Sequence, residues 1–584
     1  MPPLIAVALG SPDAAVHSAA ANTIVRLSDT QTKQVAQLVE SSVSARIWLA
    51  MGRTARSSTV NLPSTKIAIQ VLQQSDATFE HRIAALRLLQ LSLGDVGPQA
   101  DIWAAFESYT ARGDLKSPSL PLDEIRQLVA KAFPSGDAVL DRELIRTIAI
   151  LGSTDRALID KLLATITPVS LPSHDIHRLA AISRIQTART EEKSAATAKV
   201  LVDLDIKIVQ QHLKQDANWD ARIIELYEAL CVADPMIPST IGAQSGFGLP
   251  GHVMFLRKIS PDKTQHAIDG FAKQIQAKED YEWNSDVVFV LGNSARKEHL
   301  RLVRGQLDNL SIQDAVLTVI SRVPMPEDRN IYLAGIDSAQ LSAVEACFNA
   351  LMKLPRSSDA AEQFILLSAA QRLTHDPKEF QIRETVIRLL QNNLSQSFAF
   401  VFGEAGHKPQ PEAIQRWADY LKSRYPDFVP ILDGGQEAAM VLSMVDTVAW
   451  ETGDAVRGKQ LFTKLSCAKC HGGRTALGPD LQGVAKRFSR KDLFASIVDP
   501  NRDVSARYQL TTVATNAGKS YSGLVAYESV DGVILRDANQ NTYRIEAEDI
   551  DTQVKRRVSL MPNSLLKNVT PQNLADLDAY IRGL

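Results

Sequence analysis

The chain has 584 residues, 45% apolar and 22% charged, a composition typical of a globular protein and not of a disordered chain, a collagen or a disulfide scaffold. At roughly 150 residues per domain, this length predicts about four domain-sized units, or fewer if one is a long repeat array. The 64 Lys and Arg residues are balanced by 66 Asp and Glu residues, so the net charge is −2. This balance excludes the global basic field of sequence-independent nucleic-acid binding, and we expect no nucleic acid as partner.

The sequence gives no indication of a membrane span or of an export signal. No apolar run approaches the roughly 18 to 20 residues that a transmembrane helix requires, so we expect a soluble chain. The N-terminal run Pro2 to Gly10 is short and apolar, but the first basic residue is Arg26. The positively charged start of a secretory signal peptide is therefore missing.

From about Asp13 to about Asp433, apolar residues recur at helical spacing in many short segments. Glycine, proline and hydroxyl residues separate the segments, as in Leu151-Gly152-Ser153-Thr154, and Pro411 stands at the first position of one helix. Four of the apolar faces consist of Ile83, Leu86, Leu89 and Leu93; of Leu144, Ile145, Ile148 and Leu151; of Leu341, Val344, Phe348 and Leu351; and of Ile414, Trp417 and Leu421.

The sequence predicts more than a dozen such helices in succession, joined by short connections. This number favours helix pairs that stack side by side, and not one bundle around a single core. The pattern resembles HEAT-type repeats, although no period with signature residues is visible. An irregular all-helical domain remains the alternative. We predict a mainly α protein, with an α-solenoid in two parts, residues 1–237 and 252–435, followed by a linker at residues 436–452.

Two features inside the helical region invite functional interpretation. Residues 238–251 hold Gly242, Gly246, Gly248 and Gly251, and since no strand precedes them they indicate a flexible junction and not a phosphate-binding loop. His174 and His177 have the spacing of metal ligands on one helix face. We interpret them as surface residues, and Cys231 and Cys347 as buried core thiols.

The sequence changes character at about Gly453. A helix is predicted from Asp454 to Leu465, another from Arg490 to Ile497, and a last one from Pro571 to the C-terminus, capped by Thr570. Between the second and third, segments with period-two alternation predict an inserted β meander with turns at Asn516-Ala517-Gly518 and Asp531-Gly532. The predicted strands lie around 508–515, 521–527 and 532–536.

The segment Cys467-Ala468-Lys469-Cys470-His471 is a CxxCH sequence, the attachment signal of a c-type haem. Two thiols at this spacing can bind the two vinyl groups of one porphyrin, and the histidine can then ligate the iron. A structural zinc site fails on ligand number, since no Cys or His follows His471. A thioredoxin-like dithiol expects a strand before the motif, where this sequence has a helix.

Two further residues complete the predicted haem site. In Gly478-Pro479-Asp480-Leu481 the carbonyl of Pro479 can accept a hydrogen bond from Nδ1 of His471 and so orient the ring. Downstream of His471 the sequence has no His and one Met, Met561, which is therefore the candidate sixth ligand. If Met561 instead packs in the core, the haem is five-coordinate.

Residues 453–584 resemble the haem-binding cytochrome domain of the planctomycete and verrucomicrobial (PVC) type, a domain often found behind HEAT-like repeats and a β-propeller dehydrogenase-like domain. The resemblance implies haem attachment to Cys467 and Cys470 and iron ligation by His471 and Met561. It is carried by the CxxCH sequence, by an insertion absent from small cytochromes c, and by Arg457-Gly458, Leu461-Phe462, Gly478-Pro479-Asp480-Leu481, Asp499-Pro500, Tyr508, Gly523 and Ser559-Leu560-Met561-Pro562.

The leading hypothesis is electron transfer by one His/Met-ligated haem c, with the solenoid as scaffold for a redox protein partner. The alternatives are the electron-accepting C-terminal part of a larger dehydrogenase, a haem peroxidase or gas sensor with an open iron site, and a binding scaffold with an accessory haem. Because haem c is attached outside the cytoplasmic membrane, we expect a periplasmic or otherwise exported protein with a truncated N-terminus.

Charge differs between the two regions of the chain. From Glu451 onward the sequence has 19 basic and 15 acidic residues, against 45 and 51 in the preceding part. Lys555-Arg556-Arg557 lies just before Met561 and could steer an acidic partner to the haem. An ordinary solvated charge run is the alternative.

Overall fold

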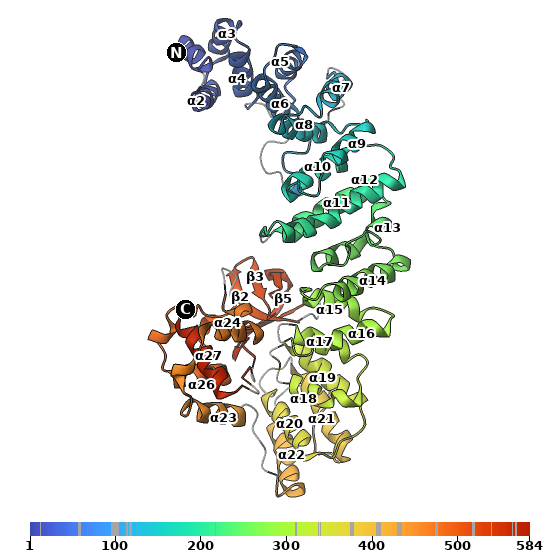
Figure 1. The fold of residues 1–584 in the computed structure, drawn as a ribbon, viewed down its shortest axis with the longest axis vertical. Coiled ribbons are helices and arrows are strands. Elements are labelled where there is room, and N and C mark those ends of the chain that lie inside the picture. Colours follow the sequence, from blue (N-terminus) through green and yellow to red (C-terminus); the bar gives the residue numbers. More distant parts are fainter. Residues whose placement is uncertain are drawn as a thin grey trace. The chain divides into compact units, whose positions relative to one another are not determined.

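The structure is a computed structural model of the chain. It describes residues 1–584 except 12, 56–59, 95–103, 112–114, 116–119, 216–217, 310–311, 337, 339, 374–378, 404–409, 429–434, 473–476, 517–519, 539, 563–564 and 567–568. The chain is mostly helical and forms two compact units, Met1–Tyr281 and Glu282–Leu584 (Figure 1). The helices of the first unit are α1 Pro2–Leu9, α2 Ala14–Ile24, α3 Asp29–Leu38, α4 Val43–Thr54, α5 Leu62–Gln73, α6 Phe79–Leu93, α7 Leu122–Ala132, α8 Ala138–Leu151, α9 Ala157–Ala164, α10 Pro172–Arg184, α11 Glu191–Gln210, α12 Trp219–Ala233, α13 Ile237–Ile241 and α14 Pro261–Ala277.

The helices of the first unit form a layered array. In one layer α2, α4, α6, α8, α10 and α12 pack each against the next, and odd-numbered helices cover it, as α5 does on α4 and α6 (Figure 1). The predicted helix around Leu144 is α8, which Asp137 caps at its start and Gly152, in the left-handed conformation at φ 57°, ends. Each helix thus contacts mainly its neighbours in the chain.

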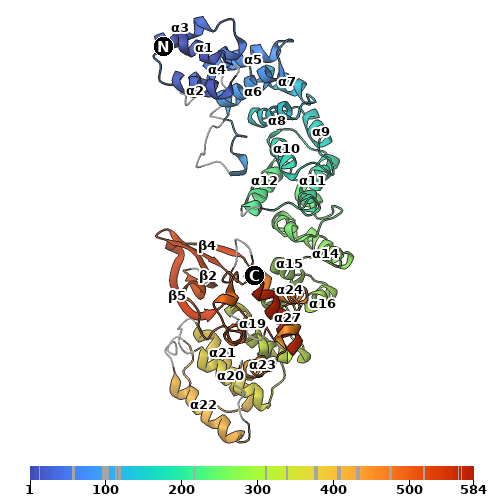
Figure 2. The same ribbon diagram turned by 60° about the vertical axis from the view of Figure 1, so that its left-hand side comes forward.

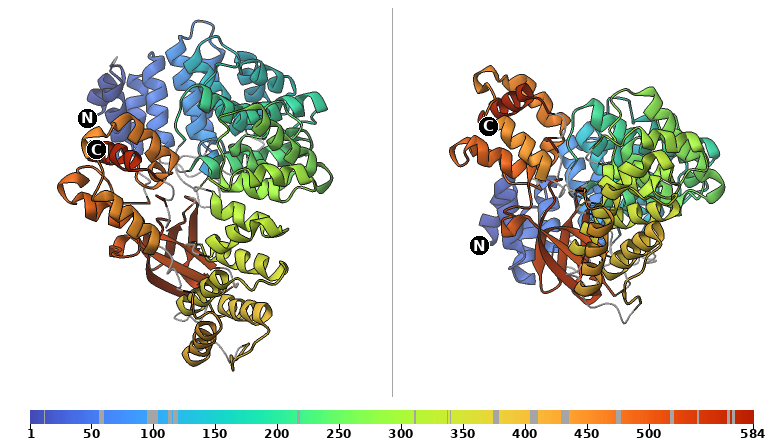
Figure 3. Two further views of the ribbon diagram at one scale, coloured as in Figure 1. Left: turned by 60° about the horizontal axis from the view of Figure 1, so that its bottom comes forward. Right: turned by 90° about the horizontal axis from the view of Figure 1, so that it is seen from below.

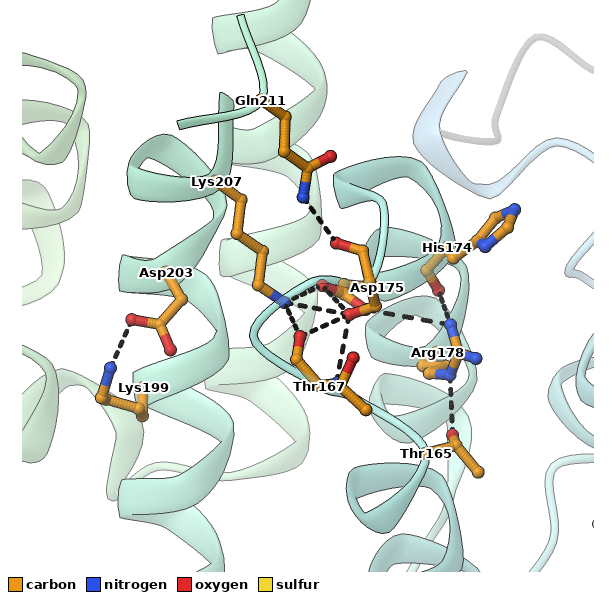
Figure 4. A network of polar contacts seen from close by, with 10 residues as sticks. Thr165, Thr167, His174, Asp175, Arg178, Lys199, Asp203, Lys207 and Gln211 are labelled. Atoms are coloured by element: carbon orange, nitrogen blue, oxygen red, sulfur yellow. Dashed lines mark hydrogen bonds and ion pairs between the residues drawn. The ribbon is translucent and has the colours of Figure 1, made fainter. Parts of the chain in front are cut away.

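A buried polar network joins α10 to α11 (Figure 4). The side chains of Asp175 and Lys207 are 0% and 4% exposed, and the ammonium of Lys207 donates to Asp175 Oδ2 at 2.5 Å, Ser170 Oγ at 3.0 Å and the Thr167 carbonyl at 2.6 Å. Gln211 adds a hydrogen bond to the Ser170 carbonyl. With both charges paired, the network has a structural role.

His174 and His177 have different surroundings. His174 is exposed, but the prediction that His177 lies at the surface is wrong, because its ring is buried between Tyr109 and the carbonyl of Arg142. Tyr109 donates to Nδ1 at 2.6 Å, Nε2 donates to Arg142 O at 2.9 Å, and burial lowers the pKa of His177 to about 4. The pair is no metal site, and the described residues contain no group of three or more metal-ligating side chains.

Residues 238–251 are closely packed, contrary to the flexible junction expected from their glycines. Gly248, at φ 113°, approaches Gly270 so closely that a Cβ would lie 2.4 Å from its carbonyl oxygen, and Tyr281 donates to the Gly248 carbonyl at 2.9 Å. The buried ring of His252 accepts hydrogen bonds from the N–H groups of Gly248 and Leu249. The glycines therefore serve close packing inside the first unit.

The second unit opens with a similar array, shown in yellow-green and yellow in Figure 2. α15, α17, α19 and α21 pack each against the next, while α16, α18 and α20 cover them. Of the remaining cysteines, Cys347 is buried as expected, but Cys231 of the first unit is only half-buried. The helices of this array are α15 Ser285–Gly292, α16 Lys297–Arg304, α17 Gln313–Ile320, α18 Arg329–Gly335, α19 Leu341–Lys353, α20 Ala360–Arg372, α21 Phe380–Leu394 and α22 Pro411–Arg424.

The C-terminal part combines helices with one sheet, drawn in brown-red in Figure 3. Its helices are α23 Gly435–Val445, α24 Ala455–Lys464, α25 Cys467–Cys470, α26 Arg490–Val498 and α27 Pro571–Arg582. The strands are β1 Gln509–Thr515, β2 Ser520–Ser529, β3 Gly532–Arg536, β4 Thr542–Glu546 and β5 Ile550–Ser559, in the antiparallel order β4-β3-β2-β1-β5.

The three predicted strands and the three predicted helices of this part are confirmed, and Thr570 caps α27 as expected. β4 and β5 are additional strands that the sequence did not indicate. β5 returns to pair with β1, so the inserted sheet is more than a meander. Of the two predicted turns, the second is confirmed, since Asp531 lies between β2 and β3 and Gly532 begins β3, whereas Ala517 and Gly518 of the first lie outside the described residues.

Candidate functional site

The CxxCH segment is placed by a sharp turn between two helices. α24 ends at Lys464, Ser466 takes the left-handed conformation at φ 60°, and Cys467 to Cys470 form the single turn of α25. The N–H of His471 donates to the Cys467 carbonyl at 2.9 Å, which closes this turn. Both cysteines are free, and the imidazole follows directly on the second one.

The two thiols contact different apolar clusters. Cys467 packs against the helical core, which contains Phe462 and Phe494, and burial raises its pKa to about 11. Cys470 packs against a second cluster formed by Leu477, Leu510, Leu524 and Leu560, and burial raises its pKa as well. Both side chains are therefore protonated thiols at neutral pH. The cluster at Cys467 is formed by helices, and the cluster at Cys470, which includes residues of the sheet, forms an apolar wall beside the second thiol.

His471 is held by the segment that follows it. Its Nδ1 donates to the Pro479 carbonyl at 2.9 Å, the hydrogen bond expected from the sequence. Gly478 lies against the ring, where a Cβ would stand 2.6 Å from Cε1, and its N–H donates to the Cys470 carbonyl at 2.7 Å. Burial lowers the pKa of His471, which favours a neutral imidazole. Among the described residues Nε2 has no hydrogen bond, so it is the nitrogen available to a metal.

The segment that carries Met561 follows directly on β5, and Met561 itself is half-buried. The preceding residue, Leu560, is 6% exposed and belongs to the apolar cluster around Cys470. The N–H of Met561 donates to Ser559 Oγ at 3.0 Å. The structure thus brings the Met561 segment to the wall that also contacts the second thiol.

The first and last helices of this part cross at Gly458. A Cβ on Gly458 would lie 2.0 Å from the Asp576 carbonyl oxygen, and the rings of Phe462 and Tyr580 meet edge to face at 5.3 Å. Sequence reasoning missed the ion pairs beside this crossing. Arg457 binds Asp576 through two nitrogens, each at 2.8 Å, and the side chain of Asp576 is only 4% exposed.

A second buried carboxylate on α27 was also missed. Asp578, 3% exposed, accepts from Arg490 of α26 at 2.8 Å and from Arg582 at 2.7 Å. The available signal was the position of both aspartates within the apolar stretch of α27 that contains Leu574, Leu577 and Ile581. Acidic residues inside an apolar face require partners.

For the run Lys555-Arg556-Arg557 the sequence left two interpretations, steering of an acidic partner or an ordinary solvated charge run, and Arg556 fits neither. These residues lie on β5, and Arg556 forms an ion pair with Glu379, whose side chain is 5% exposed. Because Arg556 is engaged inside the chain, it is not available to an acidic partner. Lys555 is exposed, and the side chain of Arg557 lies outside what the structure describes.

Residues 455–522 match the family model of cytochrome c. The match contains Cys467, Cys470, His471 and Pro479 and ends within β2, before Met561. Among curated proteins no match is found. The C-terminal part therefore contains a cytochrome c domain, a kind of domain that binds haem covalently, transfers electrons and is typically exported. Among the described helices, none is long and apolar enough to cross a membrane.

Proposed function

We propose that this protein transfers single electrons through one haem c bound in its cytochrome c domain, where His471 and Met561 would ligate the iron. The observation that carries the proposal is the orientation of His471 beside two free thiols. With Nδ1 engaged by the Pro479 carbonyl, Nε2 is the nitrogen that would bind the iron. When bound, a haem c supplies a centre for reversible one-electron oxidation and reduction.

The residues present fit a covalently attached haem. Each thiol, Cys467 and Cys470, would add its S–H across one vinyl group, forming one C–S bond and one C–H bond. The apolar side chains around the two thiols, Phe462, Leu477 and Leu560 among them, would keep water away from the porphyrin. Such burial favours the less charged iron state and so supports a high reduction potential.

Two observations support Met561 as the sixth ligand. It is the one methionine after His471, where the sequence has no further histidine. Its neighbour Leu560 is packed in the cluster that contacts Cys470. Ligation of a haem iron by methionine together with histidine raises the reduction potential, which would suit an electron acceptor and carrier.

For the helical region, we propose a HEAT-like α-solenoid that acts as a scaffold and docking surface for a redox protein partner or an associated dehydrogenase. The row of helices that pack each against the next supports this proposal. The resemblance of residues 453–584 to PVC-type domains supports the same architecture. We further propose that the protein works in the periplasm, where haem c is attached.

The test is the full chain, produced behind an added signal peptide in a host competent for c-type maturation. We expect a haem that stays bound on denaturation, and a methionine-to-iron charge-transfer band that Met561→Ala abolishes. Met444→Ala is the matched control, because Met444 is also partly buried in the helical core and should leave the band intact. Covalent haem without the band in the parent chain would overturn Met561 ligation and favour peroxidase or sensor chemistry. An exported chain without covalent haem would overturn the proposal as a whole.

A further inference from the structure

The segment that carries Met561 is attached to the rest of the domain by a side chain distant in the sequence. The carboxamide oxygen of Asn501, in the turn after α26, accepts a hydrogen bond from the N–H of Ser559 at 2.8 Å. Asn501 and Ser559 are 58 residues apart in the chain. This contact ties the end of β5 to the segment that follows the helix carrying Phe494.

The regular pairing of β5 fails just before this point. Thr511 of β1 pairs with Lys555, but the next paired position joins Gln509 to Ser559, so β5 advances four residues while β1 advances two. Such a bulge interrupts the ladder and frees backbone groups from it. The Asn501 carboxamide therefore adds a second hold on the strand end, beside the pairing that resumes between Ser559 and Gln509.

A second hydrogen bond restrains the backbone of Met561 relative to Ser559. Ser559 Oγ accepts from the Met561 N–H at 3.0 Å, a local turn that fixes the direction of the chain after β5. Between the two residues, Leu560 is buried in the cluster around Cys470. Asn501, the Ser559 hydroxyl and the Leu560 side chain together fix the backbone of Met561 relative to the CxxCH segment.

We propose that Asn501 and Ser559 are positioning residues for Met561, an inference that rests on the proposed ligation of the iron by this methionine. A thioether is a neutral, weak ligand, and its hold on a metal depends on how little freedom its loop retains when it dissociates. The two hydrogen bonds reduce this freedom before any ligand binds. They therefore decide how well Met561 resists replacement by an external ligand such as imidazole.

The test compares Asn501→Ala and Ser559→Ala with the parent in the full-length holoprotein, by titrating the ferric form with imidazole. Because one hydrogen bond contributes about 1 kcal/mol, each variant should bind imidazole about fivefold to tenfold more tightly and lose its charge-transfer band at lower imidazole concentration. Asn501→Asp and Ser559→Thr keep the acceptor oxygen and should stay close to the parent. Asn516→Ala is the matched control, since Asn516 donates to the Glu548 carbonyl at the opposite end of β1.

A second measurement does not depend on the iron. In Asn501→Ala the backbone amide of Ser559 should exchange with solvent deuterium about fivefold to tenfold faster, while amides of α24 and α27 keep their rates. A parent with the charge-transfer band and variants with unchanged imidazole affinity would overturn this inference and leave the proposed function standing. A parent without the band, matching Met561→Ala, would overturn both.

Discussion

The ion pair of Arg457 and Asp576 should contribute to the stability of the cytochrome c domain in a pH-dependent way. The carboxylate accepts four hydrogen bonds: two from Arg457 at 2.8 Å, one from the Asp454 N–H at 2.9 Å and one from Gln572 at 2.9 Å. The hydrogen bonds from Arg457, above all, lower the pKa of Asp576 from 3.8 to about 2. The perturbation to test is Asp576→Asn, which removes the charge and keeps the shape.

The magnitude follows from the contacts. A pKa lowered to about 2 corresponds to at most about 2 kcal/mol of stability. Because the Arg457 side chain is 54% exposed, solvent screening reduces the expected loss to about 1 kcal/mol. The folded-state pKa lies below the unfolded one, so this stability is fully present above about pH 4 and is lost as the pH falls through about 2.

The assay is equilibrium urea unfolding of the full-length holoprotein, followed by haem absorption, at several pH values between about 7 and 2.5. The free energy of unfolding of Asp576→Asn should be lower by about 1 kcal/mol at neutral pH, and this difference should shrink at the acid end. Asp503→Asn, which changes an exposed carboxylate, should have little effect. A difference between parent and Asp576→Asn that stays constant across the pH range would refute the argument.

Three further predictions follow from the packing. Gly458→Ala should destabilise the domain by about 1 to 3 kcal/mol in urea unfolding, since its Cβ would meet backbone atoms of α27. The control Gly583→Ala should change the free energy of unfolding by no more than about 0.5 kcal/mol. Equal effects of the two substitutions would contradict the close crossing. Gly478→Ala should displace the His471 ring and lower the haem content of the purified chain, and unchanged content would argue against this contact. Because the folded-state pKa of His177 is about 4, against 6.5 when unfolded, the first unit should lose stability as the pH falls from about 6.5 to 4, as thermal unfolding can measure. That loss should be smaller in His177→Gln, and an equal loss in both proteins would rule out His177 as its cause.

The helices and the CxxCH segment could be predicted because both depend on the spacing of residues that are close together in the sequence. α8 and α19 have the predicted apolar faces, and Pro479 lies close enough in the chain to His471 for its role to be inferred. β5 was not predicted, because Lys555 and its two basic neighbours hide the alternation of a strand whose partner, β1, lies about 40 residues away. Local sequence carries no information on such a pairing.

Contacts between distant segments account for the other differences. The glycine-rich stretch around Gly248 indicated a loose connection, yet its glycine is needed for the approach to Gly270. His177 stands beside polar residues in the sequence but is buried by Tyr109, from a different part of the chain. In the candidate site, Asn501 was missed for the same reason, since its acceptor role depends on where β5 ends.

The inserted sheet is part of the candidate haem site and not an appendage to it. Leu510 of β1 and Leu524 of β2 belong to the same cluster as Leu560 and Cys470, so the sheet supplies much of one wall around the second thiol. The side chain of Gln540, just before β4, donates to the Lys469 carbonyl at 2.9 Å and ties the insertion to the CxxCH segment itself. The insertion ends with β5 and its bulge, and the Met561 segment follows directly on this strand. The inserted sheet that forms part of the apolar wall beside Cys470 therefore also positions the Met561 segment at this wall.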